Sequence, residues 1–237
     1  RDQDLLPRCV QLVIAICVKK IFVLMIGAVA AIGLLAGCSN SESSFEAQSY
    51  VSSESVSGVC VDVSNREVKV SLSSDDLVHI DYFESDEESY TISISDDGIL
   101  NMAAENSEGI SEFFGVKSSG EQNKISLQVP SDLLASLKIR TRNENISVAA
   151  LSVANDITLS NNNGDISFDK LTVGNGLRIE NKNGNISGSA VGSYDDFTIF
   201  TESKKGESNL PASNEGGAKT LNVTNNNGDI DIAFVNE

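Results

Sequence analysis

Short segments in which apolar and polar residues alternate run through the chain from Val59 onward. In Glu67–Leu72, for example, Val68, Val70 and Leu72 fall on one face, with polar residues between them on the other. This period of two is typical of a β-strand with one buried face. Six such strands are expected before the repeats described next, at 59–63, 67–72, 77–83, 90–95, 99–103 and 124–129. The stretch 105–122 breaks the pattern and predicts a loop or short helix over one end.

The second half of the chain contains a sequence repeat of about 20 residues. Four copies align without gaps, namely LKIRTRNENIS from Leu137, ITLSNNNGDIS from Ile157, LRIENKNGNIS from Leu177 and LNVTNNNGDID from Leu221. A degenerate copy, FTIFTESKKGES, begins at Phe197, so the starts are spaced 20, 20, 20 and 24 residues apart. A unit of this length cannot bury its own apolar face and must stack on its neighbours, which predicts a β-solenoid.

Each copy carries an isoleucine and a tight turn at fixed positions. Four isoleucines are expected to form one inward column, Ile146, Ile166, Ile186 and Ile230. Glycine tolerates positive φ and lets the chain reverse between strands. The predicted turn residues are Asn163, Gly164, Asp165, Asn183, Gly184, Asn185, Asn227, Gly228 and Asp229. Asn143 shares the position of Asn163, Asn183 and Asn227, and these side chains could hydrogen-bond in a ladder along the stack.

These patterns predict an all-β protein in which paired N-terminal strands lead into a short β-solenoid, similar to a parallel β-helix, of about five 20-residue rungs. The composition agrees, because Trp is absent, aromatic residues make up 5% and Gly occurs 18 times. Short strands joined by tight turns require such residues.

The segment from Val18 to Cys38, VKKIFVLMIGAVAAIGLLAGC, has the layout of a bacterial export signal. Its apolar run covers residues 21–36, which is shorter than the roughly 18 to 20 residues that a membrane-spanning helix needs. A permanent transmembrane anchor is therefore the weaker alternative. The ending Leu-Ala-Gly-Cys resembles the lipobox of bacterial lipoproteins, which implies cleavage between Gly37 and Cys38 and a lipid on the Cys38 thiol. A secretory signal that happens to contain a cysteine remains the other interpretation.

Three regions are expected. Residues 1–37 form the signal peptide, of which 1–17 fit badly and are interpreted as a non-native upstream extension. Residues 38–57 comprise the lipidated cysteine and a tether rich in Ser and Glu, which has too few large apolar residues to form a core. Residues 58–237 form the repeat domain.

The motif N-x-N-G-D/N-I in tandem behind a lipobox resembles the bacterial DUF4097 family of β-strand repeat proteins, or putative adhesins. The segments KKGESNLP at 204–211 and GAKTLNVTNNNGDIDIAF near the end support the resemblance, which covers the chain from about Val59. It implies a β-repeat fold and a location on the cell surface, and it supplies no activity.

The sequence offers little catalytic or metal-binding chemistry. Asp165 and Asp229 lack the spacing of EF-hands and of calcium-binding β-rolls, so they are interpreted as turn residues. His79 is the only histidine, which leaves no pair for a His-based catalytic site. Cys60 is interpreted as a small strand residue, and a disulfide framework is poorly supported because Cys9, Cys17 and Cys38 lie in or before the export segment. No catalytic residue, cofactor or metal site is predicted.

The net charge of −17 disfavours binding to nucleic acid, whose phosphates an acidic surface repels. The sequence predicts a lipid-anchored, non-catalytic binding or scaffolding protein of the bacterial envelope, held at the membrane through Cys38. The resemblance to DUF4097 implies that it is an adhesin. Its ligand, an envelope or host-surface component, stays unknown. The alternative is a β-helix polysaccharide lyase or hydrolase that acts on extracellular glycans.

Overall fold

The computed structural model describes residues 45–85, 88–105, 120–130 and 134–236. These residues form strands and turns and contain no α-helix, only two short 3-10 turns, η1 (Gly120–Asn123) and η2 (Tyr194–Asp196). The all-β prediction is confirmed. In the same ranges, no helix is long and apolar enough to span a membrane.

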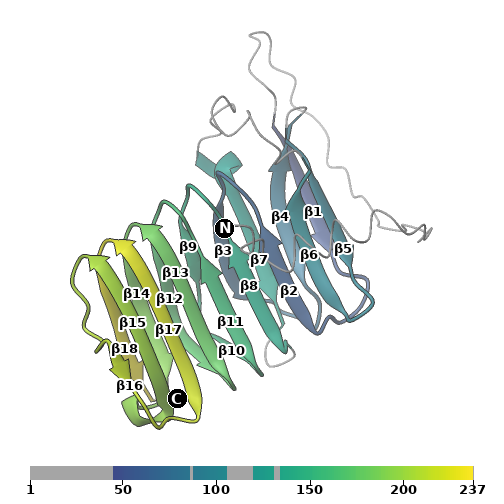
Figure 1. The fold of residues 1–237 in the computed structure, drawn as a ribbon. Coiled ribbons are helices and arrows are strands. Elements are labelled where there is room, and N and C mark those ends of the chain that lie inside the picture. Colours follow the sequence, from purple (N-terminus) through teal and green to yellow (C-terminus); the bar gives the residue numbers. More distant parts are fainter. Residues whose placement is uncertain (1–44, 86–87, 106–119, 131–133, 237) are drawn as a thin grey trace, which may run out of the picture.

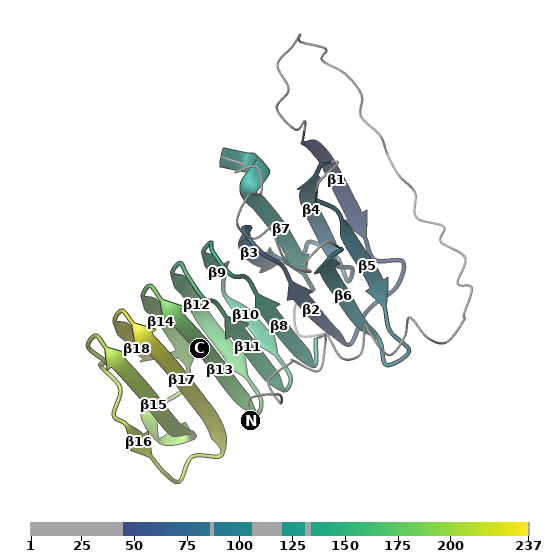
Figure 2. The ribbon, with the colours of Figure 1, turned by 45° about the horizontal axis from the view of Figure 1, so that its top comes forward.

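The strands form two sheets that face each other, and each runs the length of the molecule (Figures 1 and 2). The first sheet, sheet A, has the order β1 (Glu46–Val51), β4 (His79–Glu84), β7 (Lys124–Val129), β3 (Glu67–Leu72), β9 (Ile146–Val148), β12 (Ile166–Val173), β14 (Ile186–Val191), β18 (Ile230–Val235). A short strand, β10 (Leu151–Val153), also pairs with β12. The strands from β7 to β18 are parallel to one another, which is the arrangement of a solenoid.

The second sheet, sheet B, supplies the opposite wall. Its order is β16 (Ser213–Asn214), β15 (Phe197–Lys205), β17 (Lys219–Asn227), β13 (Gly176–Asn183), β11 (Asp156–Ser160), β8 (Ser136–Arg140), β2 (Gly58–Asp62), β6 (Ile99–Ala104), β5 (Tyr90–Ile94). Each complete rung is one strand of sheet B followed by one strand of sheet A. A tight turn joins the two strands in the repeats, whereas residues 105–123 separate β6 from β7. One apolar cluster between the sheets extends from Val56 to Ile232.

The predicted isoleucine column is present. Ile166 lies beside Ile146 on one side and Ile186 on the other, and Ile186 lies beside Ile230. All four side chains are at most 2% exposed. The column continues into the N-terminal half, where Val68 in β3 lies beside Ile146. The rungs β2–β3 and β6–β7 thus extend the solenoid beyond the predicted repeats.

The spatial order of the rungs differs from the chain order at both ends of the stack. Strand β2 lies between β6 and β8, although β6 comes later in the sequence than β2. At the other end, β17 lies between β13 and β15, so the last repeat is stacked between the third repeat and the degenerate one. The degenerate copy is therefore the outermost rung, although it precedes the last repeat in the chain.

The register of that copy also needs correction. Ile199, and not Phe197, lies beside Leu221, which places the copy starts 20, 20, 22 and 22 residues apart. A shift of two residues keeps the alternation of inward and outward side chains, so hydrophobic pattern alone cannot detect it. The turn glycine gives the register, because Lys205 pairs with Asn227 and thereby places Gly206 beside Gly228.

Part of the predicted tether is folded. Strand β1 pairs antiparallel with β4, so Tyr50 lies beside Ile80 at the edge of sheet A. Ser52 is 2% exposed, and its Oγ accepts a hydrogen bond from the Val78 amide at 3.0 Å. Backbone pairing does not depend on apolar composition, which explains why a Ser- and Glu-rich segment forms a strand here. Residues 38–44 of the predicted tether lie outside the described residues, as does the predicted signal peptide with its cleavage position between Gly37 and Cys38.

The six strands expected before the repeats are all present, within two residues of their predicted bounds. Strands β4 and β5 run antiparallel to their neighbours β7 and β6. Most of the loop predicted at 105–122 lies outside the described residues, and its last part forms the beginning of η1.

Candidate functional site

The tight turns between the two sheets require glycine. Gly164, Gly184 and Gly228 have φ values of 124°, 122° and 129°, a region that other residues rarely adopt. A Cβ on Gly184 would lie 2.2 Å from the carbonyl oxygen of Gly164 in the next rung. Neighbouring turns therefore pack backbone against backbone.

The predicted asparagine ladder runs along this edge of the stack. Nδ2 of Asn163 donates to Oδ1 of Asn143 at 2.8 Å, Asn183 donates to Asn163 at 2.8 Å, and Asn227 donates to Asn183 at 2.7 Å. Asn65 extends the ladder by one rung, since its Oδ1 accepts a hydrogen bond from Asn143 at 2.5 Å. The ladder therefore joins the repeats to the N-terminal half.

A second asparagine row, which sequence reasoning missed, is buried behind the turns. Asn161, Asn181 and Asn225 are at most 3% exposed, at positions where alternation predicts an inward side chain. Nδ2 of Asn181 donates to the Gly164 carbonyl at 3.0 Å, and Asn225 donates to the Gly184 carbonyl at 2.9 Å. These amides supply partners for turn carbonyls that would otherwise be buried without one. The sequence signal that could have revealed this row is the run of three consecutive polar residues at the end of each of these strands.

A third row follows the glycines and faces the outer side of sheet A. It consists of Asn145, Asp165, Asn185, Asp229 and Glu207, in spatial order. In the first four, Oδ1 accepts a hydrogen bond from the backbone amide of the next residue in the row, at 2.7 to 3.0 Å. Asp165 and Asp229 thus each accept a backbone hydrogen bond, and both side chains are also exposed to solvent.

A shallow groove of about 400 Å³ lies beside this row on the outer face of sheet A. One wall is formed by the first four residues of this row, and the floor is a second column formed by Ser147, Ser167, Ser187 and Asp231. Oγ of Ser147 lies 3.1 Å from Oγ of Ser167, so these two hydroxyls are hydrogen-bonded. The groove is lined by hydrogen-bonding groups on rigid strands, and we define it by these eight residues as the sheet A groove.

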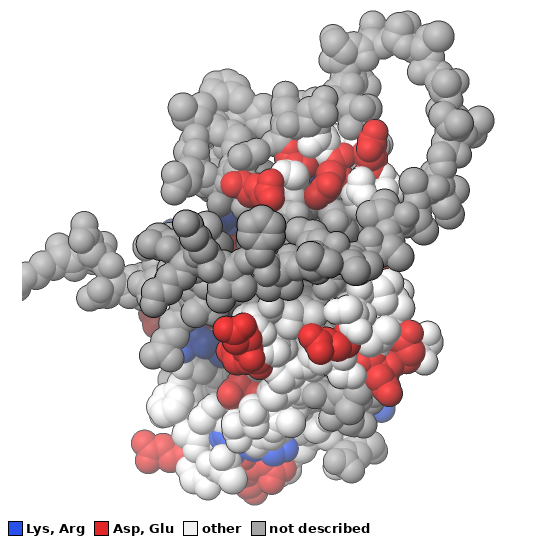
Figure 3. Space-filling model, turned by 90° about the vertical axis from the view of Figure 1, so that its right-hand side faces the viewer, with Lys and Arg blue, Asp and Glu red and all other residues white. Residues whose placement is uncertain are grey.

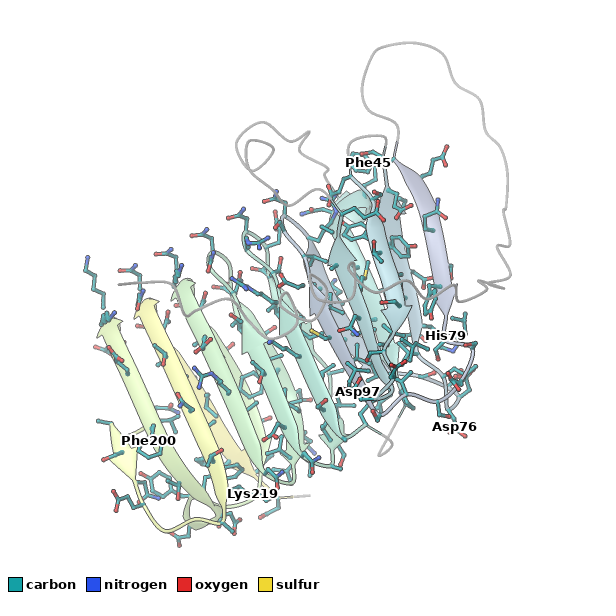
Figure 4. All side chains as sticks on the ribbon, turned by 45° about the vertical axis from the view of Figure 1, so that its right-hand side comes forward. Phe45, Asp76, His79, Asp97, Phe200 and Lys219 are labelled. Atoms are coloured by element: carbon teal, nitrogen blue, oxygen red, sulfur yellow. The ribbon has the colours of Figure 1, made fainter. Side chains whose placement is uncertain are left out.

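The turns between the two sheets form one edge of the stack, and positively charged residues lie on the sheet B side of this turn edge. Arg142, Lys182 and Lys204 occupy one outward position of the repeat, and Asn162 and Asn226 occupy it in the rungs between them. Figure 4 shows long side chains projecting along this edge of the ribbon. The edge thus separates a basic row on the sheet B side from the acidic groove wall on the sheet A side.

The remaining candidate residues form local contacts. Nε2 of His79 donates to Oδ1 of Asp75 at 2.8 Å, and this hydrogen bond is the main reason that the pKa of Asp75 is lowered to about 2. Cys60 is buried in β2, where it was expected as a small strand residue. Among the described residues, no three His, Cys, Asp or Glu side chains are grouped closely enough to hold a metal ion.

A buried ion pair distinguishes the N-terminal end. Arg66 is 2% exposed and lies 2.5 Å from Oε2 of Glu88. The other carboxylate oxygen of Glu88 accepts a hydrogen bond from the Tyr90 hydroxyl. Burial raises the pKa of Tyr90. The Arg66 guanidinium also lies over the ring of Phe45, labelled in Figure 4, at 5.5 Å from its centroid. These contacts fasten the chain that enters β1 to the body of the stack.

Comparisons with known proteins agree with this geometry. The profile of the Toastrack family, DUF4097, matches residues 56–232. The chain belongs to the DUF4097 family. Among solved structures, a putative cell adhesion protein from Clostridium sporogenes is similar, with 12% identity and a TM-score of 0.58 over 80% of this chain and 100% of that one. A putative adhesin from Bacteroides fragilis has 10% identity and a TM-score of 0.34 over 81% and 97% of the two chains.

No curated protein sequence matches the chain. The similarity to the Clostridium sporogenes structure, at 12% identity, shows a shared fold and leaves the ligand to be argued from the residues.

Proposed function

We propose that this DUF4097 protein is a non-catalytic binding module on the bacterial cell surface, an adhesin in the broad sense, and that the sheet A groove is its ligand site. The observation that carries the proposal is the groove itself. Exposed amides, carboxylates and hydroxyls repeat on successive strands, which lie about 4.8 Å apart in a sheet. A rigid, periodic row of this kind suits an extended polymer better than a small molecule.

The arrangement of the carboxylates favours binding over hydrolysis. A glycosidase places two carboxyl groups on either side of the scissile bond, roughly 5 to 9.5 Å apart. In the groove, Asp165 and Asp229 lie in line on one wall, and each carboxylate already accepts a backbone hydrogen bond. His79 pairs with Asp75 on the neighbouring loop and is not part of the groove.

The similar structure from Clostridium sporogenes supports an adhesive role. It is a putative cell adhesion protein, and this name does not describe an enzyme. We extend that role to this chain on the shared fold together with the groove.

Anchoring through a lipid on Cys38 is part of the proposal. Six residues, 39–44, separate Cys38 from the described chain, and at roughly 3.3 Å per extended residue they reach about 20 Å. The end of the stack formed by β1, β4 and β5 would then face the membrane. Figure 3 shows this end, where Asp and Glu side chains predominate over Lys and Arg on the described surface. Such a surface is repelled by anionic lipids, so a covalent lipid has to supply the attachment.

Two measurements test the proposal. Mass spectrometry of the membrane-extracted protein should show a diacylglyceryl group on an N-terminal Cys38, and a Cys38→Ser variant should lose membrane attachment. A glycan array and a pull-down with isolated envelope material should show retention of the protein without product release. Release of product from any polysaccharide, lost on replacement of one carboxylate, would instead establish the lyase or hydrolase alternative.

A further inference from the structure

The wall of the sheet A groove has a period of two rungs. Its residues alternate between amide and carboxylate in spatial order, from Asn145 to Asp165, Asn185 and Asp229. Since neighbouring strands lie about 4.8 Å apart, the amides recur about every 9.6 Å along the wall, and so do the carboxylates. The sequence order hides the last step, because β17 is inserted next to β13 and brings Asp229 beside Asn185.

Backbone contacts leave one side-chain atom of each residue facing the groove. Oδ1 of all four residues accepts an amide hydrogen bond from the next rung, which orients the side chains identically. Within the described part of the chain, the second atom, Nδ2 in Asn145 and Asn185 and Oδ2 in Asp165 and Asp229, makes no hydrogen bond. The wall therefore presents donor, acceptor, donor and acceptor along the stack axis.

The charges across the turn edge follow the same period. Arg142 and Lys182 lie in the rungs whose groove residue is an asparagine. Asn162 and Asn226 lie in the rungs of Asp165 and Asp229. The two carboxylates thus have no cation in their own turn, and their negative charge remains directed to the solvent that fills the groove.

We propose that the sheet A groove binds a linear amino-sugar polymer, lying along the stack axis, in which an ammonium-bearing sugar alternates with an N-acetylated one. Two sugar rings of an extended chain are close in length to two rungs. Each ammonium group would meet Asp165 or Asp229, and each acetamido carbonyl would accept a hydrogen bond from Asn145 or Asn185. The serine floor would contact ring hydroxyls. This inference rests on the proposed function, since it names the ligand of the same groove.

The test uses the full chain and chitosan hexamers of defined acetylation pattern, with affinity measured by calorimetry. The strictly alternating hexamer should bind at least tenfold more tightly than the fully acetylated one. The variant Asp165→Asn/Asp229→Asn should lose this preference, because it removes both charges and keeps the backbone acceptor that asparagine supplies in the other rungs. The reverse variant, Asn145→Asp/Asn185→Asp, should shift the preference to the fully deacetylated hexamer.

A matched control removes two carboxylates outside the groove. Asp156→Asn/Asp169→Asn should retain the wild-type preference, since Asp156 lies on sheet B and Asp169 lies beyond the groove floor. A further arm uses envelope glycans of the producing cell as competitors, before and after chemical N-acetylation. Competition that N-acetylation abolishes would identify the cell's own glycan as the source. Binding of the hexamer without such competition would identify an external source.

Equal binding of all hexamers, or a preference unchanged in Asp165→Asn/Asp229→Asn, would overturn the inference. If the protein binds only neutral or anionic glycans on the array, the proposed function stands and the amino-sugar ligand falls. If it binds neither array glycans nor envelope material, both fall.

Discussion

The C-terminal repeats and the N-terminal end of the stack share inward columns but have different turns. In the repeats, asparagine rows and glycines make each turn similar to the next, and hydrogen bonds link the side chains of the asparagine ladder from one rung to the next. At the N-terminal end, Arg66, Glu88 and Tyr90 form a single buried cluster, and antiparallel strands replace the repeat. The apolar columns are therefore sufficient for stacking. The regular turns are what build a periodic groove, because only identical turns place equivalent side chains in a row.

The largest effect should come from breaking the column that both regions share. Ile166→Asp buries an unpaired charge between two neighbouring isoleucines, at a cost of several kcal/mol, comparable to the stability of a domain. Ser167→Asp, one residue away on the outer face, should be tolerated, because Asp231 already occupies that column in the last rung. Urea unfolding checks both variants. A native unfolding midpoint for Ile166→Asp would contradict the shared column.

The next effect is confined to the regular turns. Gly184→Ala should destabilise the protein by about 3 kcal/mol, because the position combines a φ of 122° with a Cβ only 2.2 Å from the Gly164 carbonyl oxygen. Gly216→Ala, at a φ of 113° with no atom within 4 Å of the added Cβ, should cost about 1 kcal/mol from backbone strain alone. Equal losses in thermal unfolding would show that the packing of turn on turn contributes nothing.

A smaller effect concerns the groove wall. Asp165→Ala removes the acceptor of the Asn185 amide and should cost about 1 kcal/mol. Asp165→Asn should be nearly silent, since asparagine fills the same role in Asn145 and Asn185. Comparing the chemical denaturation of Asp165→Ala and Asp165→Asn separates the contribution of the hydrogen bond to stability from that of the charge. A large loss in Asp165→Asn would mean that the carboxylate itself is structural.

The smallest effect lies in the N-terminal half and depends on pH. The hydrogen bond from His79 lowers the pKa of Asp75 to about 2 in the folded protein, below its usual value of 3.8. The contribution of this pair to stability is therefore present above the usual value and is lost as the pH falls toward 2. An NMR titration should place the Asp75 midpoint near 2, and His79→Ala should move it toward 3.8. An unchanged midpoint in that variant would remove His79 as the cause.

The sequence was sufficient for the parts that repeat in register. The Ile146 to Ile230 column, the Asn143 to Asn227 ladder and the glycine turns follow from side chains that recur at fixed spacing. The sequence was insufficient where the spatial order of strands differs from the chain order. A parallel strand can pair with either free edge of its neighbour, and its own hydrophobic pattern is the same in both arrangements. Sequence reasoning also missed β1, whose stability comes from backbone pairing with β4 and the contact between Phe45 and Arg66.

The periodic groove wall is the least accessible feature from sequence. Asp165 and Asp229 were recognised as turn residues, but their alternation with asparagine appears only once Asp229 is placed beside Asn185. That placement requires the order β13, β17, β15 and decides whether the wall alternates at all. If β15 lay next to β13, Glu207 would follow Asn185, and Asp229 would lie at the end of the row.

Cysteine cross-linking tests this order most directly. In-register residues of adjacent strands lie about 4.8 Å apart, within the range of Cα separations that a disulfide accepts. Arg178→Cys/Asn222→Cys joins β13 to β17, whereas Arg178→Cys/Phe200→Cys would join β13 to β15 if the rungs followed the chain order. Peptide mass mapping without reduction should find the 178–222 cross-link and no 178–200 cross-link. The opposite result would contradict the rung order and, with it, the alternating wall of the groove.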